Sequence, residues 1–365
     1  MLSISLIIFN LFTFSLANGD EIQNTNDGPY LFKTEEGIVG KWVEDSTLFQ
    51  EIITADNYPK LQSKFNFKFG FDALTQDFSS QIDYVQEYEG IDSLVAFSDI
   101  HGQYDLYIQL LKANGIIDND MNWSYGTGHM VIVGDIFDRG DKVTEVLWHV
   151  FGLQKQAEKA GGKVHLVLGN HEVMVLNNDL RYIHDKYKTT ETLTSTTYDQ
   201  LYADNTVLGQ WLRSKPVAIK INDMIFAHGG LSPTLVNNDV SIEKINKTFA
   251  DQILGQNRAS ILRDEFLELL YRSNGPIWYR GYFYDDKFTE QSIDSVLNYY
   301  DANHAIVGHC SYDSVITRFN NKILGVDTSI KRGENGEVLK WNSGGYFKGT
   351  LSGEVKALPK ATAFP

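Results

Sequence analysis

The sequence predicts an α/β fold in which short buried strands alternate with helices over the central part of the chain. Three apolar runs each stop at polar residues and glycine: SLVAFSDIHG from Ser93, GHMVIVGDIFDRG from Gly128 and KVHLVLGNHE from Lys163. The segments between them, 103–114 and 141–160, carry apolar residues at helical spacing. Buried strands that alternate with helices are typical of βαβ units in a largely parallel sheet.

The composition indicates a folded protein with an acidic surface. The 365 residues suffice for one large domain or two ordinary ones, and 42% of them are hydrophobic and 13% aromatic. Asp and Glu number 47 against 32 Lys and Arg, which gives a net charge of −15. Such a surface repels phosphate backbones, so we expect no nucleic-acid partner.

Residues 1–17 have the character of a signal peptide. Residues 2–17 carry no charge, and the run ends in Ser15-Leu16-Ala17, where small residues suit a signal peptidase. The alternatives are an N-terminal anchor or a buried helix, although the run is shorter than the about 20 residues of a membrane span. We expect a periplasmic or secreted protein without a membrane segment after cleavage, and a cytoplasmic one if 1–17 is not a signal peptide.

The rest of the chain divides into three parts. Residues 18–90 are rich in aromatic and charged residues and are expected to form an N-terminal extension packed on the main domain. Within it, polar and aromatic residues alternate from Ser63 to Phe71, which predicts a half-exposed strand. The main domain is expected to span 91–335, followed by a C-terminal hairpin and tail at 336–365.

Polar side chains that can bind metal follow each predicted strand. Two later strands obey the same rule, since DMIFAHGGL stops at His228 and HAIVGHC at His309. Ligands bind at the carboxyl ends of the strands in sheets of this kind. The strand-end candidates are Asp99, His101, Asp135, Asn170, His228 and His309.

This set of residues predicts two metal ions. Oxygen and imidazole ligands in this mixture suit Mn, Fe or Zn. Six ligands are too many for one ion with open positions, but they suit two ions that share a carboxylate and act on a phosphoryl group. Any one motif alone would be an ordinary turn. The five histidines outside this pattern are expected to be ordinary surface or core histidines. These are His129, His149, His165, His184 and His304.

Five ordered motifs resemble those of a known family. They are SDIHG at 98–102, GDIFDRG at 134–140, GNHE at 169–172, HGG at 228–230 and GH at 308–309. The sequence is similar to the phosphoprotein phosphatases of the calcineurin-like metallophosphoesterase superfamily. Ser98 and Phe137 replace the usual glycine and valine, and GVDTSI at 325–330 and GPIWYRGYF at 275–283 resemble the bacterial-type Shewanella-like branch. The resemblance implies a β-sandwich of mixed sheets flanked by helices, with a dinuclear metal site at the strand carboxyl ends.

The resemblance also implies a role for each motif residue. Asp99, His101 and Asp135 would hold the first ion, and Asp135, Asn170, His228 and His309 would hold the second. A water between the ions would lose its proton and attack phosphorus in line. His171 would protonate the leaving oxygen, and Asp138 would orient His171. The phosphoryl oxygens would be bound by Arg139, Arg280 and Asn170.

These roles predict a metal-dependent phosphomonoesterase that acts on phosphoproteins, phosphotyrosine in particular. The alternatives are a metallohydrolase of small phosphate esters or dinucleoside polyphosphates, and a phosphate-binding module without catalysis. An intact His171 and Asp138 argue against the last, because a binding module has no need for a proton donor. The sequence gives no indication of the oligomeric state.

Cys310, the single cysteine, is not predicted to be a nucleophile. A cysteine-dependent phosphatase needs an arginine six positions after the cysteine, where this chain has Ile316, and Arg318 comes two positions too late. The loop also lacks the glycines that would turn its amides toward a phosphate. Cys310 is therefore expected to pack as a small apolar residue.

Overall fold

The computed structural model describes residues 24–78, 80 and 82–358. The expected signal peptide at 1–17 and the end of the C-terminal tail, 359–365, lie outside the described residues. Among the helices of the described part, none is long and apolar enough to cross a membrane.

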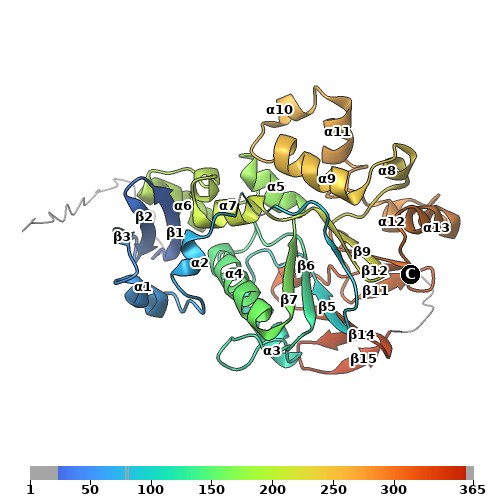
Figure 1. Cartoon of the computed structure of the whole chain (residues 1–365), viewed down its shortest axis with the longest axis horizontal. Coiled ribbons are helices and arrows are strands. Elements are labelled where there is room, and N and C mark those ends of the chain that lie inside the picture. Colours follow the sequence, from blue (N-terminus) through green and yellow to red (C-terminus); the bar gives the residue numbers. More distant parts are fainter. Residues whose placement is uncertain (1–23, 79, 81, 359–365) are drawn as a thin grey trace, which may run out of the picture.

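Two six-stranded sheets form the centre of the molecule (Figure 1). The first has, in spatial order, β15 (Val355–Ala357), β14 (Gly345–Thr350), β13 (Glu337–Asn342), β5 (Ser93–Phe97), β6 (His129–Val133) and β7 (Lys163–Val167). The second has β11 (Ile316–Arg318), β12 (Ile323–Gly325), β10 (His304–Val307), β9 (Met224–Ala227), β8 (Ala218–Ile221) and β4 (Glu87–Tyr88).

Both sheets are mixed, with a parallel centre and antiparallel flanks. Strands β5, β6 and β7 are parallel, and β13 runs antiparallel to β5. In the second sheet, β10 is parallel to β9 and β12, whereas β8 is antiparallel to β9. The helices α3 (Tyr104–Ala113) and α4 (Val143–Ala160) are the crossovers between the first parallel strands, as their helical spacing predicted. The expected α/β sandwich of mixed sheets is confirmed.

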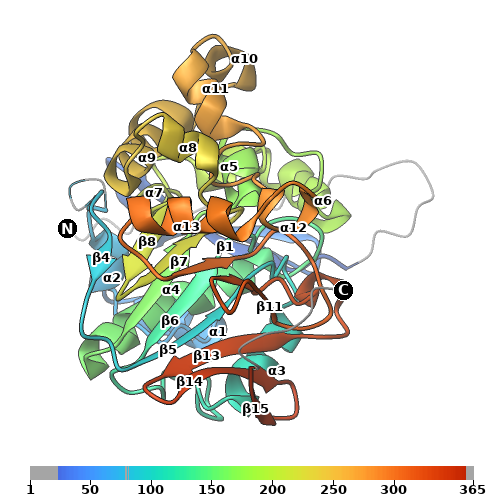
Figure 2. The same cartoon turned by 90° about the vertical axis from the view of Figure 1, so that its right-hand side faces the viewer.

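Alternate residues of the central strands face two different cores. Leu94 and Ala96 of β5 belong to the core shared with Ile219 and Phe226 of the other sheet. Val95 and Phe97 point the opposite way and join the larger core under the helices. Successive side chains of a strand alternate between its faces, so these fully buried runs have no polar face. Figure 2 shows β7, β6, β5, β13 and β14 of the first sheet one after the other, below helices α8 to α11.

The remaining helices surround the two sheets. They are α1 (Tyr58–Lys64), α2 (Asp72–Thr75), α5 (Asn170–Leu176), α6 (Asp185–Thr194), α7 (Val207–Arg213), α8 (Pro233–Asn237), α9 (Ile242–Thr248), α10 (Arg258–Ile261), α11 (Glu265–Tyr271), α12 (Gly281–Tyr284) and α13 (Glu290–Tyr299). Shorter turns are 3₁₀ at Asp199–Tyr202 and Ile330–Arg332, and a π turn at Phe249–Ile253. Helices α8 to α11 lie together at the top of both views, beside α5 (Figure 1).

Residues 27–53 form a separate three-stranded antiparallel sheet beside α6 and α7 (Figure 1). It comprises β1 (Asp27–Thr34), β2 (Gly37–Glu44) and β3 (Thr47–Ile53). The Trp148 indole of α4 donates to the Pro29 carbonyl at 2.9 Å, and the Thr144 hydroxyl donates to Asp27 at 3.1 Å. These buried hydrogen bonds join the small sheet to the helix that flanks the first large sheet.

The strand predicted from Ser63 to Phe71 is wrong. Helix α1 ends at Lys64, and the aromatic residues after it are in an irregular segment. Phe67 and Phe69 are buried, and each of their rings lies within 6 Å of the Trp148 ring. The alternation therefore reflects which side chains are buried against α4. The segment does not pair with a neighbouring strand.

Candidate active site

The six candidate ligands gather at the carboxyl ends of five strands, as the sequence predicted. Asp99, Asp135 and Asn170 follow β5, β6 and β7 of the first sheet, while His228 and His309 follow β9 and β10 of the second. All six are buried, with His309 the most exposed at 7%. Both sheets thus supply side chains to one enclosed site.

Several ligand positions have left-handed backbone. The φ angle is 55° at Asp99, 46° at His101, 62° at Asp135 and 63° at His309. Residues other than glycine rarely adopt this conformation, which costs on the order of 1–3 kcal/mol each. Hydrogen bonds between the loops hold it, since the Asp99 amide donates to Gly134 and the His101 amide to Asp135, both at 3.0 Å. Strain that persists at several adjacent loops is typical of a functional site.

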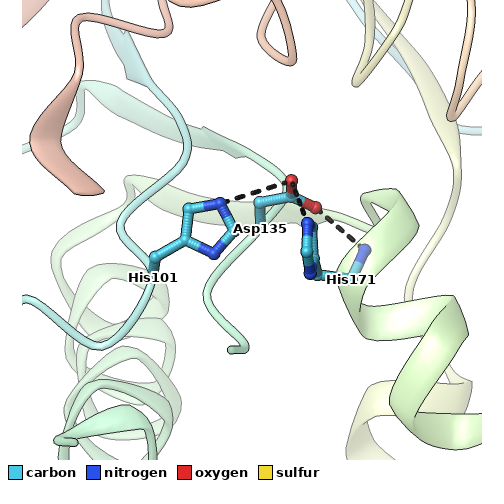
Figure 3. Close-up of side chains that lie close together, drawn as sticks. All are labelled: His101, Asp135 and His171. Atoms are coloured by element: carbon cyan, nitrogen blue, oxygen red, sulfur yellow. Dashed lines mark hydrogen bonds and ion pairs between the residues drawn. The ribbon is translucent and has the colours of Figure 1, made fainter. Parts of the chain in front are cut away.

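The Asp135 carboxylate lies at the centre of the site. Its Oδ2 atom is 3.1 Å from Nε2 of His228. The same atom is 3.7 Å from Nε2 of His101 and 3.9 Å from Nε2 of His171 (Figure 3). Two groups of potential ligand atoms share this residue: His101, Asp135 and His171 form one, and Asp135, His228 and His309 form the other. Asp99 borders the first group, with Oδ1 3.7 Å from Nε2 of His101.

Backbone carbonyls orient two of the imidazoles. Nδ1 of His101 donates to the Phe137 carbonyl at 2.6 Å, and Nδ1 of His228 donates to the Val133 carbonyl at 2.7 Å. A carbonyl can only accept, so each Nε2 is left unprotonated in the neutral ring and faces the carboxylates. Nε2 of His101 is buried without a hydrogen-bond partner among the described residues. A buried, unsatisfied imidazole nitrogen beside two carboxylates is the environment that a divalent metal ion satisfies.

The charges of the site also call for a cation. Burial opposes ionisation of Asp135, but the neighbouring His228 and His171 hold the pKa of that carboxyl well below its usual range. Burial likewise opposes a charge on His228, but the Asp135 and Asp99 carboxylates raise the pKa of His228 to about 10. An imidazole must lose its proton to bind a metal ion. The ion would then supply the positive charge that the Asp135 and Asp99 carboxylates attract. The donor set therefore fits divalent metal ions.

His171 and Asp138 form a buried pair beside these ligands. Nδ1 of His171 is 2.5 Å from Oδ2 of Asp138, and Nε2 of His171 faces Asp135. Burial disfavours a charge on this imidazole, but the Asp135 and Asp138 carboxylates outweigh it and raise the pKa of His171. A proton on Nε2 is thereby held next to the centre of the site, which is the geometry that a general acid needs.

The sequence of this region matches a known family. Residues 93–310, which contain the whole ligand set, match the family described as calcineurin-like phosphoesterase. The chain belongs to this family. The fold, the clustered candidate ligands and the predicted class of enzyme agree with it, so the protein is a metallophosphoesterase.

Three similar proteins are phosphatases by name. The crystal structure of a cold-active protein-tyrosine phosphatase from a psychrophilic Shewanella is 40% identical, covers 92% of this chain and 99% of that chain, and superposes with a TM-score of 0.81. Shewanella-like protein phosphatase 1 of Plasmodium berghei is 29% identical over 259 residues, 68% of this chain and 70% of that protein. Shewanella-like protein phosphatase 2 of Arabidopsis thaliana is 39% identical over 114 residues, 31% of this chain and 29% of that protein. The resemblance inferred from the motifs is confirmed, and the enzyme is a phosphatase.

The two candidate phosphate-binding arginines lie at the exposed surface of the metallophosphoesterase site. Nε of Arg280 donates to Nε2 of His309 at 2.9 Å. His309 can therefore bind a metal ion only through Nδ1 unless Arg280 releases Nε2. The guanidinium of Arg139 is 5.9 Å from the centre of the Tyr182 ring. Arg280 directly precedes α12, and Arg139 lies in the loop after β6 beside Asp138.

Glu172 fixes the Asp135 loop, a role that the sequence analysis did not assign. This carboxylate is fully buried and accepts hydrogen bonds from the amides of Asp135 at 2.8 Å, Ile136 at 2.6 Å and Gly169 at 2.7 Å. The GNHE motif contains Glu172. Only the fold, however, brings the amides of the distant Asp135 loop to the carboxylate that also binds the Gly169 amide of the same motif. A Cβ atom at Gly169 would collide with the Asp135 carboxylate, so this turn requires glycine.

Two further side chains contact Asp99, and a third, Asp327, contacts one of them; the sequence analysis gave none of the three a role. The Ser98 hydroxyl donates to Oδ2 of Asp99 at 2.7 Å. Nζ of Lys331 is 3.5 Å from Oδ1 of Asp99 and 3.0 Å from Asp327. Asp327 belongs to the GVDTSI segment, which the sequence connected only with the Shewanella-like branch. The serine that replaces the family's glycine thus orients a ligand carboxylate.

The histidines outside the motifs lie away from the ligands. Nε2 of His165 and Nδ1 of His129 are 3.0 Å apart, and both residues are on strands β6 and β7 ahead of the site. Nδ1 of His149 lies 3.0 Å from the Tyr107 hydroxyl, and the His184 ring caps the first turn of α6. These contacts are the structural ones expected of core and surface histidines.

Cys310→Ser is expected to retain most of the phosphatase activity. The thiol is 2% exposed, and burial raises its pKa to about 12, so it is a thiol rather than a nucleophilic thiolate at neutral pH. Activity should survive iodoacetamide and disappear with EDTA. Inactivation of the wild type by alkylation, combined with resistance to chelators, would establish a cysteine mechanism instead.

Proposed function

We propose that this phosphatase hydrolyses phosphomonoesters of proteins, phosphotyrosine in particular, with two divalent metal ions. The observation that carries the proposal is that one carboxylate, Asp135, belongs to both groups of ligand atoms, with the His171–Asp138 pair directly beside it. Phosphotyrosine is favoured because the relative that is 40% identical over 92% of this chain is called a protein-tyrosine phosphatase.

The described residues can be divided between two ions. Asp99 and His101 would bind the first, and Asn170, His228 and His309 the second, with Asp135 shared. Oδ1 of Asn170 is 3.0 Å from Nε2 of His228, so these two atoms can approach the same ion. Mixed oxygen and imidazole ligands favour Mn, Fe or Zn. When bound, the ions would lower the pKa of a shared water and neutralise charge on the phosphoryl oxygens.

The side chains of the protein supply the other steps. Arg139 and Arg280 are positioned to bind the phosphoryl oxygens, for which a planar guanidinium is well shaped. His171 would give the proton on Nε2 to the leaving oxygen, and Asp138 would hold the ring through Nδ1 and stabilise its charge. The burial of His171, at 4% exposure, would keep bulk water from competing for that proton.

A panel of substrates tests the proposal. Purified protein loaded with Mn should be assayed side by side on a phosphotyrosine peptide, a phosphoserine peptide, nucleoside monophosphates and diadenosine tetraphosphate. The expected result is the highest kcat/KM on the phosphotyrosine peptide, and complete loss with EDTA. A higher kcat/KM on diadenosine tetraphosphate would overturn the proposal and establish a hydrolase of dinucleoside polyphosphates.

A further inference from the structure

Tyr182 is a large aromatic residue that remains exposed beside the most buried part of the active site. Tyr182 lies in the loop between α5 and α6 and is 46% exposed. Aromatic side chains of this size are ordinarily buried, and single exposed ones are common enough to mean little alone. The contacts of Tyr182 give this one a specific position.

The Tyr182 ring lies against the candidate acid and near two guanidinium groups. The ring centroid is 5.5 Å from that of His171, with 55° between the ring planes. The guanidinium carbons of Arg139 and Arg181 are 5.9 and 5.4 Å from the ring centre. Arg181 is in turn held by two hydrogen bonds to Asp179, of 2.7 and 2.8 Å. Cations over an aromatic face restrict its movement, so the ring is exposed and oriented at once.

The loop that carries Tyr182 is also joined to the loop that carries the phosphate-binding arginine. The Arg139 amide donates to the Tyr182 carbonyl at 3.0 Å. This bond involves only the backbone, so it survives replacement of the side chain. The ring is therefore not needed to hold the Arg139 backbone, and its contact with His171 requires another explanation.

We propose that Tyr182 is a specificity-determining residue that contacts the aromatic ring of the leaving group. The inference rests on the proposed function, in which His171 protonates the leaving oxygen. In an aryl phosphate this oxygen is bonded directly to a ring carbon, so the aryl ring must lie next to His171, where the Tyr182 ring forms the adjacent wall. In phosphoserine the oxygen carries only a methylene group, which is too small to fill the same contact.

Pairs of aromatic rings attract each other at centroid distances of about 4.5–7 Å, beyond the burial of their surfaces. The exposed part of the Tyr182 ring is free to make such a contact with a substrate ring. The contact forms in the bound ester and in the transition state alike, because the ring does not change during the reaction. Its loss should therefore raise KM and leave kcat nearly unchanged.

The test compares Tyr182→Ala with Tyr182→Phe, and uses Phe49→Ala as a matched control. Phe49 is 36% exposed on β3, where it stacks on Trp42. KM and kcat should be measured with phenyl phosphate and with β-glycerophosphate, together with the inhibition constants of phenylphosphonate and methylphosphonate. For Tyr182→Ala, we expect KM for phenyl phosphate and Ki for phenylphosphonate to rise about fivefold, with the alkyl values unchanged. Tyr182→Phe and Phe49→Ala should behave as the wild type.

Each other outcome has a definite meaning. Equal losses on aryl and alkyl ligands would show that the ring only positions His171 or Arg139, and no change with any ligand would show that it makes no substrate contact. Both results overturn the inference. If the wild type hydrolysed neither ester, the proposed function would fail instead. Calorimetric binding of the two phosphonates to wild type and Tyr182→Ala would then still decide whether Tyr182 recognises an aromatic ring.

Discussion

Asp135→Asn is expected to remove most of the phosphatase activity and to lower the metal content at both positions together. Asp135 is the residue common to both groups of ligand atoms, and its Oδ2 faces three imidazoles. The neutral amide of Asn lacks the negative charge with which a carboxylate binds two cations at once, so neither ion keeps its full ligand set. Activity should fall by at least about 100-fold, because loss of even an outer partner of a metal ligand costs roughly 10–100-fold. Elemental analysis of the purified variant measures the metal content.

Asp138→Asn is the matched control for this experiment. Asp138 is equally buried and belongs to the same loop, with φ of 70°, but it is a member of neither group of potential ligand atoms and contacts only the Nδ1 atom of His171. This variant should keep its metal while Asp135→Asn loses it. Two full equivalents of tightly bound metal in Asp135→Asn would contradict the assignment of Asp135 as the shared ligand.

His171→Asn is expected to slow the hydrolysis of alkyl phosphates far more than that of p-nitrophenyl phosphate. General acid catalysis contributes about 10²–10⁴-fold, which corresponds to roughly 3–5 kcal/mol of barrier. An alkoxide leaving group needs the proton from Nε2, a phenolate needs it less, and nitrophenolate leaves almost without it. The rate should therefore fall about 10²–10⁴-fold on β-glycerophosphate and only a few-fold on p-nitrophenyl phosphate. Steady-state kcat on a series of esters with different leaving-group pKa gives the measurement.

The metal content of His171→Asn should stay unchanged, although His171 is a member of the first group of potential ligand atoms. Asp138→Asn should show the same dependence on the leaving group, but more weakly, because Asp138 acts only through the imidazole. If all substrates slowed equally, or if metal were lost, His171 would serve as a ligand or a binding residue, and the role of general acid would have to be abandoned.

The strand-end residues could be predicted because each of them closes an apolar run that is visible in the sequence. Burial of the run and the position of the polar residue are local properties, and parallel strands bring their ends together. The interactions of Glu172 with the Asp135 loop and of Lys331 with Asp99 are not local. They span 37 and 232 positions, and nothing in the sequence pairs these residues.

The wrong prediction at 63–71 has the same physical origin. The alternation of aromatic residues was correct as a pattern of burial, since Phe67 and Phe69 are buried and Lys68 between them is more exposed. A strand also needs a neighbour that accepts its backbone hydrogen bonds, and this requirement depends on the rest of the fold. Here helix α4 provides an apolar surface and no such backbone partner.

The division of the ligands between two sheets couples chemistry to the late stages of folding. The first sheet alone offers Asp99, His101, Asp135 and Asn170, and the second alone offers His228 and His309. The two sets meet only after the apolar faces around Ala96 and Phe226 have packed together. A chain that has formed only one sheet, or both sheets without packing them together, cannot bring Asp135 next to His228 and His309. We therefore expect a partly assembled chain to have no phosphatase activity, and catalytic competence to arrive together with the native core.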